Sequence, residues 1–279
     1  MQPAEEPRNV GPAAPVRSHM VGWSNRPHRP ADRLPPPARD RRLQGTRLAA
    51  GARPAANRKA YRMNIALLGL SADPPHLGHL AVAQAVYEEG FDRFWFLITP
   101  QNPFKDVSAL SYWHRRELAR ILAEGTRAFD VSDFEAGVAV HDPDLRTHTV
   151  MEALHQRMPE VNFTFVMGAD AWADDKKGFH TWKNFTGILA FAGLLILQRQ
   201  PWTSAIHTCP AAVALSGVYA PGTGPVPRGK WRVSNQPIDH TASSTEVRQQ
   251  LARNGTSEHM LPSQLGYLRK HKLLGLGQP

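Results

Sequence analysis

The stretch NIALLGLSADPPHLGHLAVAQAVYEE, residues 64–89, decides the fold. It opens with an apolar run over 64–70, which predicts a central parallel strand buried on both faces. A short loop with glycine and proline follows, and the segment 79–89 then predicts a helix. A strand that passes through a tight loop into a helix is the first part of a β–α–β unit.

The same alternation continues to the C-terminal end of the chain. Apolar runs predict strands, and apolar residues at helical spacing predict helices, one of them capped by Ser111. Further strands are expected at 93–99, 129–135, 162–168 and 193–199, and further helices at 111–125, 149–159, 180–189, 243–255 and 262–275. The pattern predicts an α/β fold with a doubly wound parallel sheet and a small C-terminal helical part. The Gly- and Pro-rich stretch 217–231 is expected to be a surface loop.

The positive charge of the chain is concentrated before the first strand. Residues 1–62 hold 13 Lys and Arg against 4 acidic residues, which accounts for the whole net charge of +9. The remainder is therefore neutral, with 20 basic and 20 acidic residues. The sequence pI of about 10.0 gives no reason to expect nucleic-acid binding by the folded body.

Residues 1–62 also contain 10 of the 24 prolines and no apolar period, so we expect this extension to be disordered. Three interpretations are open. The extension is a basic tail that contacts RNA or an anionic membrane, or it is a transit peptide, although Glu5 and Glu6 argue against a transit peptide. The third interpretation, a stretch without a specific role, is favoured. Met63 opens the first strand and could itself be the start, so the expected domain covers residues 63–275.

Two further features bear on the environment of the protein. The longest apolar run, residues 187–197, is far short of the roughly 20 residues that a membrane span needs. Cys209 is the only cysteine, which excludes a disulfide framework and a Cys-based zinc site. A cytoplasmic enzyme without membrane contact is expected. The sequence leaves the oligomeric state open, and a homo-oligomer is one alternative.

His76 and His79 are the first candidates for chemistry. In doubly wound sheets ligands bind beyond the carboxyl ends of the strands, where this loop falls. Gly69 and Gly78 allow close backbone approach, and the helix start near His79 offers N–H groups and a positive dipole end to an anion. As alternatives, a histidine here is a helix cap, a surface residue, or a zinc ligand for which no third ligand is identifiable.

The stretch SSTEVR, residues 243–248, predicts a second helix start. Ser243 and Glu246 fit a capping box. The hydroxyls of Ser243, Ser244 and Thr245 also stand at the positive helix end, and Arg248 follows one turn later within reach of a phosphate. Two such helix starts together predict a polyphosphate cradle. Lys105, after the second strand, is a further basic candidate, with a solvated loop lysine as the alternative.

These motifs resemble a known family. GLSADPPHLGH is similar to the H-x-G-H signature of the nucleotidylyltransferases, and SSTEVR to their I-S-S-T-x-[IV]-R motif. FVMGADAW (165–172), FHTWKNF (179–185), PQNPFK, the R-x-P of Arg199 and Pro201, and the ending LPSQLGYLRKHKLLG resemble the bacterial nicotinate mononucleotide adenylyltransferases. The resemblance spans roughly residues 63–275, with the motifs in the family's order, and implies a Rossmann-like nucleotidylyltransferase fold.

The sequence departs from the family at several positions. Ala72 stands where the family usually has Phe, and Ala242 stands where an Ile usually precedes the two serines. Residues 146–154 match the family's T-x-D-T segment only loosely, with Thr147 as its first Thr and Thr149 in place of the Asp. The pyridine pocket is therefore less well defined by the resemblance than the ATP site.

The resemblance implies that ATP and nicotinate mononucleotide react to give the dinucleotide and pyrophosphate. The attacking phosphate oxygen is already anionic, so catalysis rests on positioning and charge stabilisation. The residues expected to be catalytic are His76, His79, Arg248 and Lys105. Those expected to bind ATP are Gly69, Ser71, His76, His79, Gly168, Asp170, Ser243, Ser244, Thr245 and Arg248.

The pyridine nucleotide is expected to meet a different set: Asp73, Lys105, Thr147 and Trp182. Trp182 would stack on the pyridine ring, because an indole face suits an electron-poor ring; its alternative is a core aromatic. Asp73 is expected to orient its loop rather than act as an acid or base. Mg²⁺ would arrive with ATP, coordinated mainly by phosphates and water, and no protein metal site is expected.

Several alternatives stay open at this point. Another adenylyltransferase of the same fold, such as the phosphopantetheine enzyme, shares the H-x-G-H signature but should lack the GAD and TW pair. A class I aminoacyl-tRNA synthetase-like protein would need a K-M-S-K-S-like loop, which the sequence lacks. An RNA-binding protein acting through the basic extension is a non-enzymatic alternative. A preference for nicotinamide mononucleotide is a further one.

Overall fold

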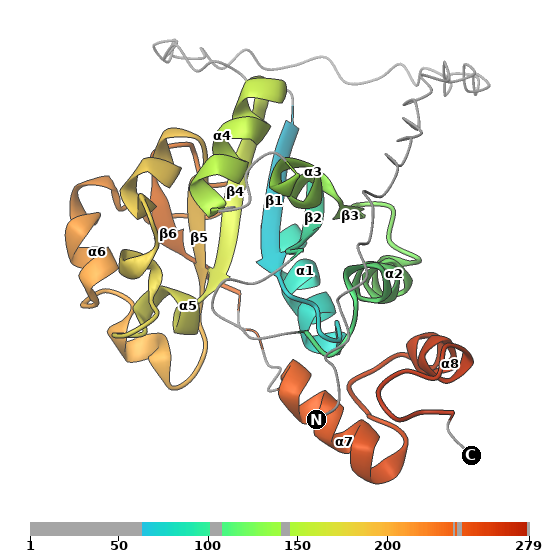
Figure 1. Cartoon of the computed structure of the whole chain (residues 1–279). Coiled ribbons are helices and arrows are strands. Elements are labelled where there is room, and N and C mark those ends of the chain that lie inside the picture. Colours follow the sequence, from blue (N-terminus) through green and yellow to red (C-terminus); the bar gives the residue numbers. More distant parts are fainter. Residues whose placement is uncertain (1–62, 101–107, 141–145, 237, 239–241, 278–279) are drawn as a thin grey trace, which may run out of the picture. The chain divides into compact units, whose positions relative to one another are not determined.

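The computed structural model describes residues 63–100, 108–140, 146–236, 238 and 242–277. Six strands form one sheet in the order β3-β2-β1-β4-β5-β6, and every neighbouring pair is parallel. The strands are β1 Met63–Leu70, β2 Arg93–Ile98, β3 Phe129–Ser132, β4 Val161–Gly168, β5 Gly193–Leu197 and β6 Trp231–Val233. The predicted doubly wound parallel sheet is confirmed (Figure 1).

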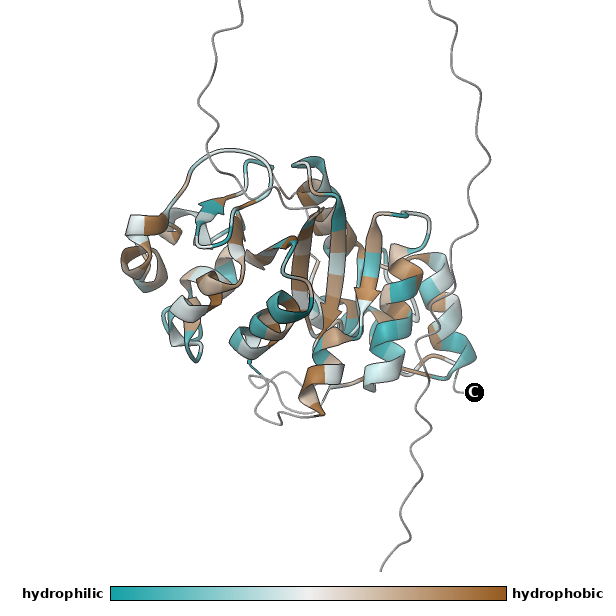
Figure 2. Cartoon of the chain, turned by 90° about the horizontal axis from the view of Figure 1, so that it is seen from above, coloured by the Kyte–Doolittle hydropathy of each residue, from teal (hydrophilic) through white to brown (hydrophobic). Residues whose placement is uncertain are grey.

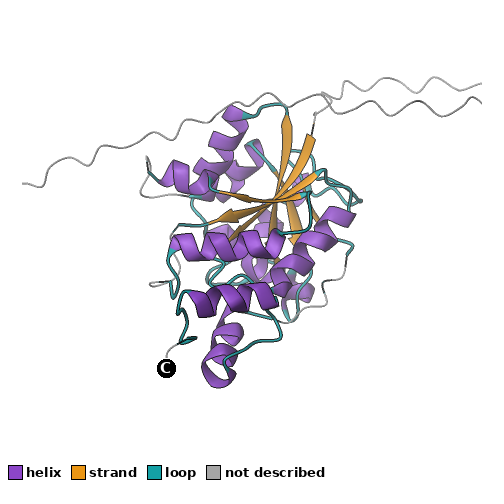
Figure 3. Ribbon diagram, turned by 90° about the vertical axis from the view of Figure 1, so that its right-hand side faces the viewer, coloured by secondary structure: helices purple, strands orange, loops and turns teal. Residues whose placement is uncertain are grey.

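Helices cover both faces of this sheet (Figure 3). The α-helices are α1 Leu77–Glu88, α2 Tyr112–Ala123, α3 Phe134–Ala139, α4 Thr147–Arg157, α5 Ala169–Ala173, α6 Pro210–Ala214, α7 Ser244–Asn254 and α8 Pro262–Lys270. The described part of the chain also contains four short 3₁₀ helices: η1 Phe179–Thr181, η2 Phe185–Ala190, η3 Trp202–Ala205 and η4 Ser216–Val218.

The core is divided by the sheet because successive strand residues face opposite sides. On β4, Phe165 belongs to a cluster that includes Val150 and Met151 of α4. Its neighbour Val166 belongs to a second cluster, which includes Val86 of α1. Figure 2 shows these hydrophobic strands at the centre of the molecule. Burial on both faces explains why the strands read as continuous apolar runs.

The two C-terminal helices, α7 and α8, form the small helical part that the sequence predicts, and Figure 1 shows them beyond the carboxyl end of β1. A third apolar cluster holds them, in which Val247 and Leu251 of α7 and Leu268 of α8 pack with Leu118 of α2. This cluster packs α7 and α8 against α2.

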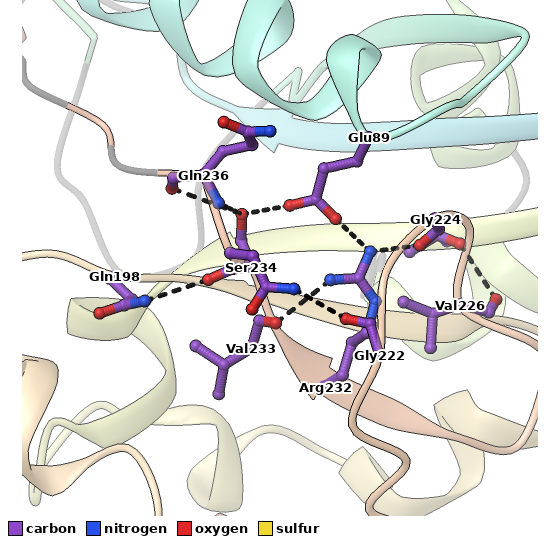
Figure 4. Close-up of polar contacts among 11 residues, drawn as sticks. Glu89, Gln198, Gly222, Gly224, Val226, Arg232, Val233, Ser234 and Gln236 are labelled. Atoms are coloured by element: carbon purple, nitrogen blue, oxygen red, sulfur yellow. Dashed lines mark hydrogen bonds and ion pairs between the residues drawn. The ribbon is translucent and has the colours of Figure 1, made fainter.

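A buried ion pair fastens the far end of α1 to the last strand (Figure 4). Arg232 of β6 donates to the carboxylate of Glu89, and both side chains are 3% exposed. Ser234 Oγ donates to the same carboxylate, and Gln198 Nε2 donates to the carbonyl of Ser234 at 3.1 Å. The network connects α1, β6 and the segment that leaves β5.

Several sequence-based expectations need correction. The helix expected over 180–189 is two short 3₁₀ turns, because Asn184 between them adopts a left-handed conformation with φ of 54°. The expected loop 217–231 is mostly exposed, as predicted, except that Val226 is buried and Trp231 already belongs to β6. The end of the expected strand 129–135 belongs to α3. The extension 1–62 lies outside the described residues.

Candidate active site

A cavity of about 720 Å³ opens where β1, β2, β4 and β5 end, and its volume is in the range of nucleotide-sized ligand sites. It brings together eleven of the residues that the sequence singles out. These are Gly69, Ser71, His76, His79, Thr147, Gly168, Asp170, Trp182, Ser243, Ser244 and Thr245. Asp73 and Arg248 are not among its lining residues, and Lys105 lies outside the described part of the chain.

The two histidines cap the helix that they begin. His76 is the N-cap residue of α1, and its Nδ1 accepts from the backbone N–H of Gly78 at 3.2 Å. His79 Nδ1 in turn accepts from the backbone N–H of His76 at 3.1 Å. A neutral imidazole that accepts at Nδ1 carries its proton at Nε2. Both rings therefore have an Nε2–H donor, and both line the cavity.

The backbone of α1 contributes less to anion binding than the sequence predicts. The N–H of Leu77 donates to the carbonyl of His259 at 2.8 Å, and the N–H of His79 donates to the carbonyl of His76 at 2.9 Å. The N–H of Gly78 is bound by His76 as described above. The first three amides of the helix thus have partners within the protein, so a phosphate here would meet imidazole donors and the helix dipole.

The start of α7 lines the same cavity as the histidines. Ser243 is its N-cap, and Ser243 Oγ accepts from the N–H of Glu246 at 3.1 Å. Ser244 Oγ donates to the carbonyl of Pro74 at 3.0 Å, and Arg248 donates to the carbonyl of Asp73. In this structure both side chains hold the loop before His76, a contact that the sequence does not predict.

Asp73 has the loop-orienting environment that the sequence predicts. The residue is 8% exposed, and its carboxylate accepts from the N–H groups of Ala109 at 2.8 Å and Leu110 at 3.0 Å. Arg248 Nη1 lies 3.8 Å from the same carboxylate. These contacts fix the loop between β1 and α1 to the segment that precedes α2.

Gly168 and Asp170 explain the spacing of the GAD motif. A Cβ atom on Gly168 would lie 2.3 Å from Asp170 Oδ1, so a side chain at position 168 would displace the carboxylate from this position. Asp170 is also 3.6 Å from Arg199 Nη1, and Arg199 lines the same cavity. The Asp170 carboxylate therefore lies just beyond the carboxyl ends of β4 and β5.

Trp182 and the start of α4 lie on one face of the sheet. Trp182 is partly buried and packs edge-on against Phe165, with ring centroids 6.2 Å apart. Phe165 shares its core cluster with Val150 and Met151, and all of them line the cavity together with Thr147. This apolar part of the wall is separate from the histidines and offers space for an aromatic ring.

Sequence reasoning missed three charged residues at this site. Arg115 is 1% exposed and donates to the carbonyls of Ser71 at 2.5 Å, Thr99 at 2.8 Å and Pro100 at 2.7 Å. Arg146, which directly precedes Thr147, and Glu135 of α3 also line the cavity. No local pattern marks Arg115, because it lies on an amphipathic helix where an arginine is normally exposed. Arg146 opens the stretch 146–154, whose loose family match is the one signal that points to it.

Among the residues that line the cavity, the Glu135 carboxyl has a pKa that its surroundings raise. Burial raises its pKa to about 7, against the lowering effects of a hydrogen bond with Thr99 and of the Arg115 charge. Burial also lowers the pKa of Arg115, although the nearby Asp73 charge opposes this. Beyond the carboxyl end of β2, the buried Arg115 guanidinium thus lies near the Glu135 carboxyl, whose pKa is about 7.

Within the described part of the chain, no group of three or more His, Cys, Asp or Glu side chains is arranged to hold a metal ion. None of the helices described is both long and apolar enough to cross a membrane.

Comparisons with known proteins find similar sequences and a similar fold. The model of the cytidylyltransferase-like family matches residues 67–250. A protein of Ruegeria sp. (strain TM1040), named "Probable nicotinate-nucleotide adenylyltransferase", is 34% identical over 205 residues, which cover 69% of this chain and 100% of the relative. A protein of the same name from Neisseria meningitidis serogroup B (strain ATCC BAA-335 / MC58) is 28% identical over 210 residues, covering 75% and 97%.

A solved structure supports the fold. The nicotinic acid mononucleotide adenylyltransferase of Plasmodium falciparum, complexed with NaAD, superimposes with a TM-score of 0.56 at 17% identity. The match covers 77% of this chain and 98% of that one.

Proposed function

This chain belongs to the nicotinate-nucleotide adenylyltransferases of the cytidylyltransferase-like family, and we propose that its cavity holds ATP and nicotinate mononucleotide together for adenylyl transfer. The enzyme transfers the adenylyl group of ATP to nicotinate mononucleotide and releases pyrophosphate, a step of NAD biosynthesis. The observation that carries the proposal is one cavity lined by His76, His79, the start of α7, Thr147 and Trp182.

The chemistry is an in-line displacement at the α-phosphorus of ATP. An anionic phosphate oxygen of the mononucleotide forms the new P–O bond, and the bond to the bridging oxygen of pyrophosphate breaks. The nucleophile needs no general base. The protein's task is to align the two substrates and to stabilise the charge that moves to the leaving group.

His76 and His79 are proposed to donate their Nε2–H groups to the α- and β-phosphates. Their Nδ1 atoms are committed to the helix start, which fixes the tautomer and the ring positions before the substrate arrives. Such preorganised donors contribute most when charge develops in the transition state. Ser243, Ser244 and Thr245 are proposed to bind the rest of the triphosphate.

Arg248 has a revised role in the ligand-free protein. It donates to the carbonyl of Asp73, and we assign to it both this contact and, once ATP is bound, a contact with the triphosphate. Asp73 is assigned to loop orientation, because its carboxylate already binds Ala109 and Leu110. The role of Lys105 in catalysis and in pyridine-nucleotide binding stays a prediction.

The pyridine side of the cavity is assigned to Trp182, Thr147 and Arg146. The indole would stack on the electron-poor ring, and Arg146 would supply a positive charge for the ring carboxylate of the nicotinate substrate. Gly168 and Asp170 are proposed to bind the ribose and adenine of ATP, beside Arg199.

Mg²⁺ is proposed to come with ATP. Among the residues that the structure describes, the acidic ones lining the cavity are Glu135 of α3 and Asp170 of α5, so this donor set fits an ion held mainly by phosphates and water. The ion would neutralise triphosphate charge. The cytoplasmic location expected from the sequence stays a prediction, as does a homo-oligomer.

The test is to incubate the full chain with Mg-ATP and either nicotinate or nicotinamide mononucleotide, and to follow dinucleotide and pyrophosphate together. Dinucleotide formation with the nicotinate substrate in equimolar amount to pyrophosphate is expected. A third reaction with phosphopantetheine addresses the related adenylyltransferases. Absence of product from both mononucleotides would overturn the proposal.

A further inference from the structure

The loop that leads into His76 is held from outside by the C-terminal helical part. Residues of this part bind the backbone of residues 73, 74, 75 and 77 one after another. The bonds are Arg248 to the carbonyl of Asp73, Ser244 Oγ to that of Pro74 at 3.0 Å, Gln264 Nε2 to that of Pro75 at 3.1 Å, and Leu77 N–H to the carbonyl of His259 at 2.8 Å.

The composition of the loop explains why it needs such partners. Pro74 and Pro75 have no N–H, so these positions offer no backbone donor to a local turn. Residues 73–75 are nevertheless buried, and buried carbonyls require hydrogen-bond donors. The donors come from side chains some 170 to 190 positions later in the sequence.

Gln264 differs from the other members of this set because it is fully buried, at 0% exposure. Its amide nitrogen donates to the carbonyl of Pro75 and to the carbonyl of Leu118 in α2, both at 3.1 Å. Its amide oxygen accepts from the N–H of Leu261 at 3.0 Å. One side chain thus joins the loop, α2 and the start of α8.

Pro75 directly precedes His76, whose ring both caps α1 and lines the cavity. We propose that Gln264 is a positioning residue for adenylyl transfer, which sets the place of the His76 imidazole by holding the carbonyl of Pro75. The role rests on the proposed function, and Gln264 itself lies outside the residues that line the cavity. A displacement of a catalytic group by about 1 Å reduces turnover by about 100-fold.

The variant Gln264→Glu tests this role. The variant keeps the length of the side chain and an oxygen that accepts from the N–H of Leu261. An ionised Glu, however, has no donor for the carbonyls of Pro75 and Leu118. We expect kcat to fall about 10- to 100-fold, with the KM for nicotinate mononucleotide within about twofold of wild type. The ratio of variant to wild-type kcat should fall further as pH rises, because a protonated Glu still offers one donor.

Gln250→Glu is the matched control. Gln250 lies in α7 and accepts from Ser257 Oγ at 2.6 Å, a bond within the C-terminal helical part. The control should keep kcat and KM near wild type. A folded Gln264→Glu enzyme with wild-type kcat would overturn the proposal, and so would an equal loss of kcat in both variants.

Two further measurements cover the remaining outcomes. Gln264→Asn keeps the amide but is too short to reach both carbonyls, and the same loss of kcat is expected. If neither Gln264 variant folds, the side chain is structural only and the proposal fails. Hydrogen exchange at the Gly78 amide, which His76 Nδ1 protects, should be faster in Gln264→Glu. This readout needs no activity, so it separates failure here from failure of the proposed function.

Discussion

The imidazole rings of His76 and His79 lie 3.9 Å apart between centroids, and each uses Nδ1 to accept a backbone N–H at the start of α1. Capping and the proposed phosphate binding therefore use different nitrogen atoms of the same rings. The two roles can be separated, because other side chains cap helices without offering a second donor in the same place.

His76→Asn is expected to separate them. Asparagine is a favourable N-cap, so the free energy of unfolding should change by less than about 1 kcal/mol. Turnover should fall about 10²- to 10³-fold, the loss typical of removing one donor to a transition-state oxyanion. Urea unfolding and steady-state kinetics on the same preparation check both statements. A variant with near wild-type kcat would exclude the proposed role of the ring.

Removal of the Trp182 indole should affect one substrate only. Base–aromatic stacking is worth about 1–3 kcal/mol, so Trp182→Ala should raise the KM for nicotinate mononucleotide about 5- to 100-fold. Trp182→Phe should retain most of the affinity, and the KM for ATP should stay near wild type in both. Equal increases in both KM values would indicate that Trp182 serves the core cluster and not the ring.

Arg146 is expected to determine the preference for the nicotinate substrate. A hydrogen bond to a charged group contributes about 1.5–3 kcal/mol, so Arg146→Gln should lower kcat/KM for nicotinate mononucleotide about 10- to 100-fold. The value for nicotinamide mononucleotide should change little. Arg157→Gln, an exposed change at the other end of α4, is the control. An unchanged ratio of the two kcat/KM values contradicts the assignment.

Glu135 makes stability depend on pH near neutrality. Its pKa is about 7 in the folded chain against an ordinary value of 4.5, so the folded chain binds the proton more tightly. The stability that the protonated Glu135 carboxyl contributes is then fully present below about pH 4.5 and is lost as the pH rises through 7. Glu135→Gln removes this loss, a gain of at most about 3 kcal/mol above pH 8.

Unfolding in urea at pH 5 and pH 8.5 measures this effect. The stability difference between Glu135→Gln and wild type should grow toward the higher pH. Glu160→Gln, at an exposed position, should show no such trend. If the stability curves of wild type and Glu135→Gln run parallel over this range, Glu135 does not titrate there.

The buried pair of Glu89 and Arg232 should be costly to break from one side. Glu89→Ala leaves the Arg232 guanidinium buried with the carbonyls of Gly224 and Val233, and the expected loss is about 3–5 kcal/mol. Replacing both residues by Met should recover much of it. Glu117→Ala, which breaks a more exposed pair with Arg120, should cost less than about 1 kcal/mol. A similar cost for both single changes would contradict the burial argument.

The sequence predicts the sheet and the two helix starts well because both leave local signals. Buried parallel strands such as β4 are continuous apolar runs, and Ser243 stands in an ordinary capping pattern. The two short turns on either side of Asn184 could not be predicted, because one left-handed residue interrupts an otherwise helical pattern.

The rest of the site depends on contacts between distant segments. Nothing near Arg115 indicates that it is buried against the carbonyls of Ser71 and Thr99, and nothing near Gln264 indicates a bond to Pro75. The partners of Arg248 were expected to be phosphates, and in the ligand-free chain the first partner is the carbonyl of Asp73. Such pairings follow from the fold and not from local patterns.

The contacts between residues 73–77 and the C-terminal helical part also order events during synthesis. The strand, the loop and both histidines leave the ribosome early, whereas Ser244 and Gln264 leave it last. A nascent or prematurely terminated chain can hold the complete sheet and still lack the donors that set the loop. Such a fragment would also lack the hydroxyls of Ser243, Ser244 and Thr245 that line the cavity, so neither the loop nor the proposed triphosphate site is complete until the last helices have been made.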